Sequence, residues 1–437
     1  MAKLTKKTRV DREKKRLQEI FKDLEPNKLE TCQSLIDRAA FITVSLQDLE
    51  VQLNETGWVE HYQNGANQGD LRCAHQSDEK SERHYEAAAR AGAAGAEREP
   101  PGGADEQMTP YANFIQEYYH KMTTGEVVVG KWVRILYEKI TAGLRDGLFY
   151  FDERKANRAI AFIETFCHHC EGRNDLIHLE LWQKSTVCLM FGIVDGDGLR
   201  IFREVFMVMG RKNGKSLFAS ACIAYMAYLD GEYGAKIYCL APKLEQAAIV
   251  YDNFFRMVLQ EPELAQLAQK RRSDVYLETT NTSIRPLAFN AKKSDGFNPH
   301  LAVCDEIASW PAEQGLKQYE VMKSALGARK QPIILSISTA GYVNDGPYDE
   351  LMMRATAVLM GASEERRLLP ILYLIDDVEK WDDIEELRKS NPNMGVSVSE
   401  DFFREEIAIA HNSLSKRAEF MTNITCAWTP SLPSSRR

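Results

Sequence analysis

The 437-residue sequence predicts an α/β fold, a P-loop nucleotide-binding domain whose mostly parallel sheet is flanked by helices and preceded by a helical N-terminal segment. Three observations carry this prediction. Short β-branched runs alternate with amphipathic helical stretches, an order that is typical of βαβ units. An apolar strand runs into a glycine-containing loop and an apolar helix at Glu204–Ser220. Another apolar strand ends in two adjacent carboxylates, Asp305 and Glu306.

The periodicity of apolar residues locates the individual elements. We expect strands at Glu204–Met209, Ala235–Leu240, Ser283–Phe289, Leu301–Asp305, Pro332–Ser338 and Leu369–Ile375. Helices are expected at Tyr111–Tyr119, Trp132–Leu144, Ala156–Cys170, Lys215–Tyr228, Lys243–Leu259 and Leu316–Leu326. Strands separated by helices in this way predict parallel pairing.

The segment GRKNGKS, Gly210–Ser216, is the strongest local signal. Consecutive backbone N–H groups and a helix N-terminus would face a phosphate there, and Lys215 would supply positive charge. The hydroxyl of Ser216 is suited to Mg²⁺. The usual G-x-x-x-x-G-K-[S/T] spacing would place a glycine at Met209, whereas Gly210 follows one residue later.

The run HLAVCDEIA, His300–Ala308, provides the second signal. Because successive strand residues point in opposite directions, the two acids at its end can serve different tasks. We expect Asp305 to hold Mg²⁺ and Glu306 to polarise the attacking water. An ordinary strand end would also fit this pattern in isolation.

Three weaker features have alternative explanations. The strand PIILSISTAG ends in Thr339, which is either a phosphate sensor or a simple strand cap. Arg211 is either a surface charge or a group that neutralises phosphate charge. The run Cys167–Cys170 suggests zinc, but we expect these four residues to lie on one helix and to point around it rather than converge.

Composition limits the class of protein. The net charge of −8 argues against nucleic-acid binding by the whole surface, but it allows a local basic lining. Nine scattered cysteines indicate reduced thiols. We find no run of roughly 18 apolar residues and no signal peptide, so we expect a cytoplasmic protein without a membrane segment.

The chain divides into five expected segments. These are a helical segment at 1–68, a linker rich in Ala, Gly, Glu and Pro at 69–107, a helical lead-in at 108–178, the ATPase domain at 179–376 and a connector with a tail at 377–437.

Together, several segments resemble the terminase large subunits of tailed phages, from about Met108 to Trp428. The resemblance rests on FIETFCHHCEG, LELWQK, GRKNGKS, KSDGFNPHLAVCDE, QPIILSISTAG, KSNPNMG and FMTNITCAW. In that branch the displaced glycine of the phosphate loop is a family habit.

The resemblance assigns roles to individual residues. It implies that ATP and Mg²⁺ are the cofactors, with Ser216 and Asp305 binding the metal. Glu306 is implied as the catalytic carboxylate, Lys215 as the phosphate ligand, and Gln183 as the adenine contact. The loop as a whole, Gly210, Arg211, Lys212, Asn213, Gly214, Lys215 and Ser216, would bind the nucleotide. Arg211 would act on the γ-phosphate, and Thr339 would belong to the coupling motif.

The function implied by the family is ATP hydrolysis that drives double-stranded phage DNA into a procapsid. The implied partners are DNA, a portal protein, a small terminase subunit and further copies in a ring. A helicase-like P-loop motor would explain the two main motifs but not LELWQK or KSDGFNPHLAVCDE. A binding-only adaptor and a non-functional gene product also stay open.

Two departures from the family are expected. Family members carry a nuclease domain after the ATPase, and we expect that domain to be absent, because the chain ends at Arg437 and its late acids do not resemble a metal cluster. Residues from about Leu17 to Gln68 resemble a small terminase subunit, which suggests a fused gene pair with Met108 as an earlier start.

Overall fold

The computed structural model describes residues 8–12, 14–15, 113–289, 296–341 and 345–426. The chain separates into two units, Met1–Asp105 and Glu106–Arg437, and nearly all the described residues belong to the second. The expected small-terminase-like segment and linker therefore lie almost entirely outside the described residues.

An eight-stranded sheet forms the centre of the second unit, in the order β10-β3-β9-β8-β4-β7-β6-β5. Its strands are β3 (Glu204–Val208), β4 (Lys236–Ala241), β5 (Ala268–Lys270), β6 (Val275–Leu277), β7 (Thr282–Ala288), β8 (Leu301–Asp305), β9 (Ile333–Ser338) and β10 (Leu368–Leu372). The pairs from β10 to β7 are parallel, and β5, β6 and β7 pair antiparallel. The α/β prediction is thus confirmed, and all six expected strands are present within one residue at their starts.

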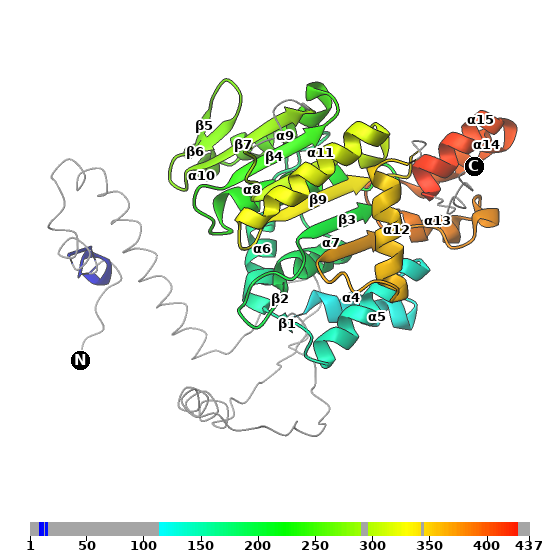
Figure 1. The fold of residues 1–437 in the computed structure, drawn as a ribbon, viewed down its shortest axis with the longest axis horizontal. Coiled ribbons are helices and arrows are strands. Elements are labelled where there is room, and N and C mark those ends of the chain that lie inside the picture. The colour runs from blue at the N-terminus through cyan, green and yellow to red at the C-terminus, as the bar shows by residue number, and fades with distance from the viewer. Residues whose placement is uncertain (1–7, 13, 16–112, 290–295, 342–344, 427–437) are drawn as a thin grey trace, which may run out of the picture. The chain divides into compact units, whose positions relative to one another are not determined.

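Helices cover both faces of this sheet, with α8 and α9 on one face and α11 and α12 on the other (Figure 1). The helices are α4 (Phe114–Thr124), α5 (Lys131–Arg145), α6 (Glu153–Phe166), α7 (Leu181–Val187), α8 (Lys215–Tyr228), α9 (Leu244–Gln260), α10 (Pro262–Ala265), α11 (Ala312–Ala325), α12 (Pro347–Met360), α13 (Ile384–Ser390), α14 (Glu400–Asn412) and α15 (Leu414–Phe420). Two short strands, β1 (Tyr150–Phe151) and β2 (Ile193–Val194), form a separate antiparallel pair. Single-turn helices lie at Cys188–Gly192, Ile307–Ser309, Leu326–Ala328, Val378–Lys380 and Met421–Thr425.

Burial on both faces explains why the central strands read as continuous apolar runs. Every residue of β3 and of β9 is buried, as a parallel sheet covered by helices requires. Helix α8 is buried almost all round, because it packs against both the sheet and α9. The phosphate loop is therefore attached at both ends to the most deeply buried elements of the domain.

The strand order places the carboxyl ends of three strands side by side at one end of the sheet. After β3 the chain crosses to β4 and skips two positions, which β9 and β8 fill later. The carboxyl ends of β3, β9 and β8 consequently meet at one edge, with Val208 opposite Ser338 and Asp305 opposite Ile337. Ligands of open α/β sheets bind at such a reversal of strand order.

A second, smaller core lies beyond β10. It contains Ile375, Trp381, Leu387, Met394, Val398, Phe403, Ala410, Phe420 and Ile424. We call residues 375–426 the C-terminal lobe. The sequence predicts only a connector here, whereas the structure shows α13, α14 and α15 packed around their own apolar cluster.

A buried cluster of charged side chains lies at the opposite end of the sheet, near the amino ends of β3 and β8. The guanidinium of Arg200 donates to both carboxylate oxygens of Asp230 at 2.8 Å, and His300 Nε2 lies 2.6 Å from Asp230 Oδ2. Burial alone would raise the pKa of Asp230, but Arg200 and His300 hold it well below its ordinary value. These residues precede β3 and β8 and follow α8, so the cluster joins three segments.

Replacing Arg200 by Met should therefore leave the buried carboxylate of Asp230 without the guanidinium that pairs with it. We expect the Arg200→Met variant to lose about 3–5 kcal/mol of unfolding free energy, measured by urea denaturation. The matched control is Arg145→Met, since the Arg145 side chain is 73% exposed beside Asp146, and it should cost less than about 1 kcal/mol. Similar small losses in both variants would contradict a stabilising role for the cluster.

Candidate functional site: a phosphate loop facing a carboxylate pair

The turn between β3 and α8 has the conformation of an anion-binding loop. Gly214 caps α8 with φ of 78°, and Lys212 also lies in the left-handed region at 65°. In the described structure, none of the backbone N–H groups from Lys212 to Ser216 donates a hydrogen bond to another protein atom. Five consecutive free donors at a helix N-terminus form a site for phosphate.

Lys215 lies at the centre of this loop. Its side chain is 6% exposed, and its ammonium group donates to the carbonyls of Met209 at 3.1 Å and Gly210 at 3.0 Å. Burial lowers the pKa of Lys215, while the carboxylates of Glu306 and Asp305 oppose that shift. A desolvated cation beside free N–H groups attracts a polyanion strongly.

The two carboxylates at the end of β8 lie in different environments, as the alternation of strand residues predicts. Glu306 has φ of 47°, a strained left-handed conformation for a residue with a side chain. Asp305 Oδ1 accepts from the Glu306 backbone N–H at 2.9 Å, and the Trp310 indole donates to the Asp305 carbonyl at 3.0 Å. These hydrogen bonds fix the backbone of the turn that carries both carboxylates.

Asp305 is short of positive charge. Burial first, and then the Glu306 carboxylate, raise the pKa of Asp305 to about 7, and Lys215 only partly offsets this. A buried carboxylate in that condition is suited to a divalent cation. The Asp305 carboxylate and the Ser216 hydroxyl offer the oxygen ligands that Mg²⁺ takes beside phosphates.

The end of β9 lies against the same turn. The Thr339 hydroxyl is 3.5 Å from Glu306 Oε2, and Ser338 Oγ accepts from the Ala308 backbone N–H at 3.1 Å. A Cβ added at Gly341 would lie 2.6 Å from Ala308, so the glycine allows this close approach. Thr339 therefore lies next to Glu306, and its expected role as a sensor stays a prediction.

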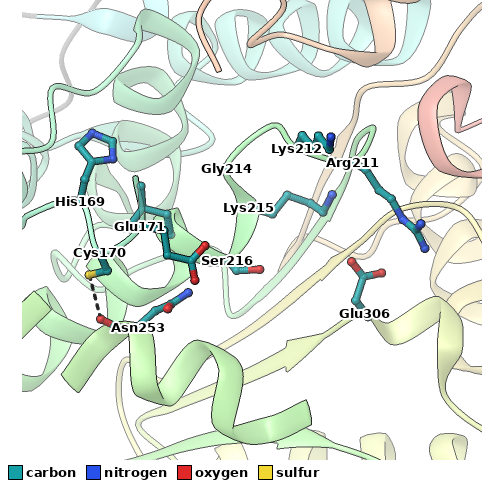
Figure 2. Close-up of a pocket in the computed structure, with 11 residues that line it drawn as sticks. His169, Cys170, Glu171, Arg211, Lys212, Gly214, Lys215, Ser216, Asn253 and Glu306 are labelled. Atoms are coloured by element: carbon teal, nitrogen blue, oxygen red, sulfur yellow. Dashed lines mark hydrogen bonds between the residues drawn. The ribbon is translucent and has the colours of Figure 1, made fainter. Parts of the chain in front are cut away.

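A groove of about 420 Å³ connects the loop and the carboxylate. It is lined by His169, Cys170, Glu171, Arg211, Lys212, Gly214, Lys215, Ser216, Leu217, Asn253 and Glu306. Figure 2 shows Lys215 between the two ends, with the Arg211 side chain extending toward the Glu306 end. Most of the expected loop residues thus line one groove with Glu306, and Arg211 is placed where it can reach a bound phosphate.

Gln183 does not line this groove. It lies in the first turn of α7, where its Oε1 accepts from the Glu180 backbone N–H at 2.9 Å. Its neighbour Trp182 lines a second cavity of about 390 Å³ and donates to Asn393 Oδ1 at 2.7 Å. The expected contact of Gln183 with adenine stays a prediction. In the described structure its Oε1 is bound to Glu180, whereas its amide N–H₂ has no hydrogen-bond partner.

One sequence-based expectation about the groove wall is wrong. Helix α6 ends at Phe166, and Cys167 caps it in an extended conformation, so Cys167–Cys170 do not lie on a helix. His168 instead forms a β-bridge with Leu176, and the Cys170 thiol donates to the Asn253 carbonyl at 3.3 Å. Tertiary contacts override the helical pattern here and place His169 and Cys170 in the groove. No group of three His, Cys, Asp or Glu residues in the described part of the chain could hold a metal ion.

The sequence also missed the residues behind the loop. Asn213 faces away from the groove and contacts Asn391 and Asn393 of the C-terminal lobe. The only sequence signal for them is the short run KSNPNMG, which has no chemical signature of its own. Their position depends on how the lobe folds back onto the loop.

Comparison with known proteins agrees with this geometry. The family model of the terminase large subunit ATPase domain matches residues 181–356, which include α7, the phosphate loop, the carboxylate pair and Thr339. Residues 181–356 of this chain thus match the ATPase domain of the terminase large subunit family, and the phosphate loop lies within the matched part.

The terminase relatives match only parts of the chain. Protein YmfN of Escherichia coli K12 is 33% identical over 137 residues, which are 31% of this chain and 30% of YmfN. The large terminase subunit of Enterobacteria phage HK97 is 28% identical over 190 residues, or 42% of this chain and 36% of the relative. That of Lactococcus phage p2 is 22% identical, over 65% of this chain and 53% of the relative. The chain thus spans between about a third and a half of these relatives.

The crystal structure of the HK97 bacteriophage large terminase confirms the fold. It superposes with a TM-score of 0.54 at 22% identity, and covers 62% of this chain and 55% of that one. Among the described residues, no helix combines the length and the apolar character that crossing a membrane requires.

The acids after Thr339 have structural partners. Asp376 pairs with Lys389 at 3.2 Å, and Asp382 lies 3.0 Å from His411. Asp377 and Asp383 cap the short helices that follow them. Each of these four carboxylates thus has a partner within the C-terminal lobe.

Removing the loop cation should abolish turnover. We expect Lys215→Ala to lower ATP hydrolysis at least about 100-fold, because the phosphates lose their buried counter-charge. Phosphate release from ATP measures the effect, and the exposed Lys243→Ala is the matched control. Hydrolysis within twofold of the unsubstituted chain would contradict the assignment of the loop.

The raised pKa of Asp305 predicts a pH dependence. As the pH falls through about 7, Asp305 takes up a proton, so the apparent affinity for Mg²⁺ with bound nucleotide should fall by up to tenfold per pH unit. Above this range the carboxylate is ionised and the affinity should level off. Mg²⁺ titrations of nucleotide binding at pH 6, 7 and 8 measure this, and Asp305→Asn corrects for titration of the nucleotide itself. If the pH dependence of Mg²⁺ affinity were the same in Asp305→Asn as in the unsubstituted chain, protonation of Asp305 would not be its cause.

Proposed function

We propose that this chain is an Mg²⁺-dependent ATPase that drives double-stranded phage DNA into a procapsid. The observation that carries the proposal is a single groove in which free backbone N–H groups, the buried Lys215 and the carboxylate of Glu306 face one another. ATP hydrolysis needs these three elements: a phosphate cradle, a counter-charge and a group that orients water.

The loop and Lys215 would bind the triphosphate. The N–H groups from Lys212 to Ser216 would surround the phosphate oxygens, and the Lys215 ammonium would leave its two carbonyl partners for the β- and γ-phosphates. Ser216 and Asp305 would hold Mg²⁺, which when bound neutralises charge on the same oxygens. Gln183 would offer its amide N–H₂ to adenine.

Glu306 would orient the attacking water. Its strained backbone and its contact with Thr339 fix the carboxylate at the groove end toward which Arg211 extends (Figure 2). Arg211 would neutralise charge that develops on the γ-phosphate. Thr339 would sense the loss of that phosphate through its hydrogen bond to Glu306.

The DNA substrate and the assembly are proposed from the family. By the family resemblance, the partners would be double-stranded DNA, a portal protein and a small terminase subunit, and we propose a homo-oligomeric ring for this chain. The net charge of −8 restricts the DNA contact to a local surface rather than the whole molecule.

Glu306→Gln separates binding from hydrolysis. The amide keeps the shape of the side chain but loses the charge that orients water, so turnover should fall about 100-fold or more while ATP affinity stays within about threefold. Turnover is measured by phosphate release and affinity by a fluorescent ATP analogue. Loss of affinity equal to the loss of turnover would contradict the role of Glu306.

Linear double-stranded DNA tests the motor against an adaptor. The unsubstituted chain should hydrolyse ATP faster with DNA, and Glu306→Gln should show no such increase. An adaptor would bind DNA without any change in hydrolysis, and a helicase-like motor would respond to single strands instead. Either outcome would overturn the packaging proposal while leaving the nucleotide site intact.

A further inference from the structure

The phosphate groove extends past the loop to a second set of polar side chains. This far end of the groove is lined by His169, Cys170, Glu171 and Asn253. Figure 2 shows the set at the end of the groove away from Glu306, with Lys215 and Ser216 between the two ends. None of the proposed steps of hydrolysis uses a residue of the far end.

A turn formed by residues 167–177 carries three of these four residues. The His169 backbone N–H donates to the Asp175 carbonyl at 2.9 Å, which closes the turn on itself. The Cys170 thiol donates to the Asn253 carbonyl at 3.3 Å and so fixes the turn to α9. The side chains of the far end are therefore held in place before a ligand binds, which lowers the cost of binding.

Two polar side chains of the far end have no partner. Neither the Glu171 carboxylate nor the Asn253 side-chain amide forms a hydrogen bond or ion pair in the described structure. In Figure 2 the Glu171 carboxylate points toward the side of the groove where Ser216 and Asn253 lie. A carboxylate beside a polyanion is favourable only where it contacts a neutral or positively charged part of the same ligand.

The turn does not have the character of another phosphate site. Burial first, and then the neighbouring Arg173, lower the pKa of His169, so its imidazole is neutral at pH 7. Arg173 donates to His169 Nε2 at 2.5 Å and pairs with Asp175 at 3.3 Å. The charge on Glu171 is negative. The far end therefore suits a neutral group with hydroxyls better than a phosphate.

The chemistry of hydrolysis gives ATP a direction in the groove. The γ-phosphate lies at the Glu306 end, because the attacking water must reach that phosphorus. The other two phosphates then follow the loop toward Ser216 and Leu217, which also line the groove. The ribose is the next group of ATP after the phosphates, and the far end is the next part of the groove.

A ribose has the hydroxyls that this end can bind. Its 2′- and 3′-hydroxyls are neutral donors, and a carboxylate accepts from a hydroxyl in a strong, charge-assisted hydrogen bond. Acidic side chains bind the ribose 2′-hydroxyl in this way in dinucleotide-binding folds. The Asn253 amide can donate to the hydroxyl oxygens. Glu171 and Asn253 thus supply the acceptor and the donor that a sugar needs.

We propose that Glu171 and Asn253 bind the ribose of ATP, with Glu171 accepting from the 2′-hydroxyl, so that the site selects ATP over 2′-deoxy-ATP. The inference rests on the proposed nucleotide site and deepens it, since it names the sugar that the site takes. A sugar contact is the same before and during hydrolysis. The selection should therefore appear in KM and leave kcat unchanged.

Phosphate release from ATP and from 2′-deoxy-ATP tests the proposal. In the unsubstituted chain, kcat/KM should be about tenfold or more higher for ATP, the usual effect of one hydrogen bond to a charged group. Glu171→Ala should lower kcat/KM for ATP about tenfold and leave that for 2′-deoxy-ATP within about twofold. Because Glu171 is exposed, this substitution removes no core contact.

Two further variants complete the experiment. Asn253→Ala should reduce the selection less than Glu171→Ala does, because a hydrogen bond from a neutral amide is weaker than one to a carboxylate. The matched control is Glu245→Ala, which removes an exposed carboxylate of α9 that does not line the groove. It should keep the full preference for ATP.

The outcomes separate the two proposals. If neither nucleotide is bound or hydrolysed, the proposed nucleotide site fails and the ribose contact fails with it. If both are hydrolysed with equal kcat/KM, or if Glu171→Ala lowers both alike, the ribose proposal is overturned and the nucleotide site stands. A raised requirement for Mg²⁺ in Glu171→Ala, with the preference for ATP intact, would also overturn it.

Discussion

The free backbone N–H groups of the phosphate loop are the constraint on which the rest of the structure depends. In the described chain, five consecutive donors from Lys212 to Ser216 have no protein partner, and such groups are stable only where water or an anion can reach them. The left-handed conformations of Lys212 and Gly214 aim them at one place. Strand β3 and helix α8 hold the loop in that strained shape because both are buried in the main core.

The charges around the loop follow from that constraint. Lys215 is buried close to the carboxylates of Asp305 and Glu306. Its single positive charge does not neutralise both of them. Burial makes the Lys215 cation and the Asp305 carboxylate costly, and a ligand that brings charges of both signs would relieve that cost. The site thus gives up stability without ligand to favour a ligand of matching charge.

The C-terminal lobe gives the phosphate loop a second set of contacts within the domain. Its polar side chains contact the loop on the side away from the groove, where Asn391 takes the space beside Gly210. Trp182 also donates to Asn393, so the α7 segment, the loop and the lobe meet at a few asparagine side chains. This junction is short, and the asparagine side chains that form it are buried.

The sequence by itself determined the sheet and the front of the site. The apolar runs of β3, β8 and β9 are short and continuous, as strands buried on both faces of a sheet are, and GRKNGKS and the Asp305–Glu306 pair carry their chemistry in adjacent residues. Only the tertiary structure decided the rest. Cys167–Cys170 left the expected helix because a bridge to Leu176 and a contact with α9 outweigh local periodicity. Asn391 acquired its place through a contact with Asn213 across 178 residues, and no local pattern encodes a contact at that distance.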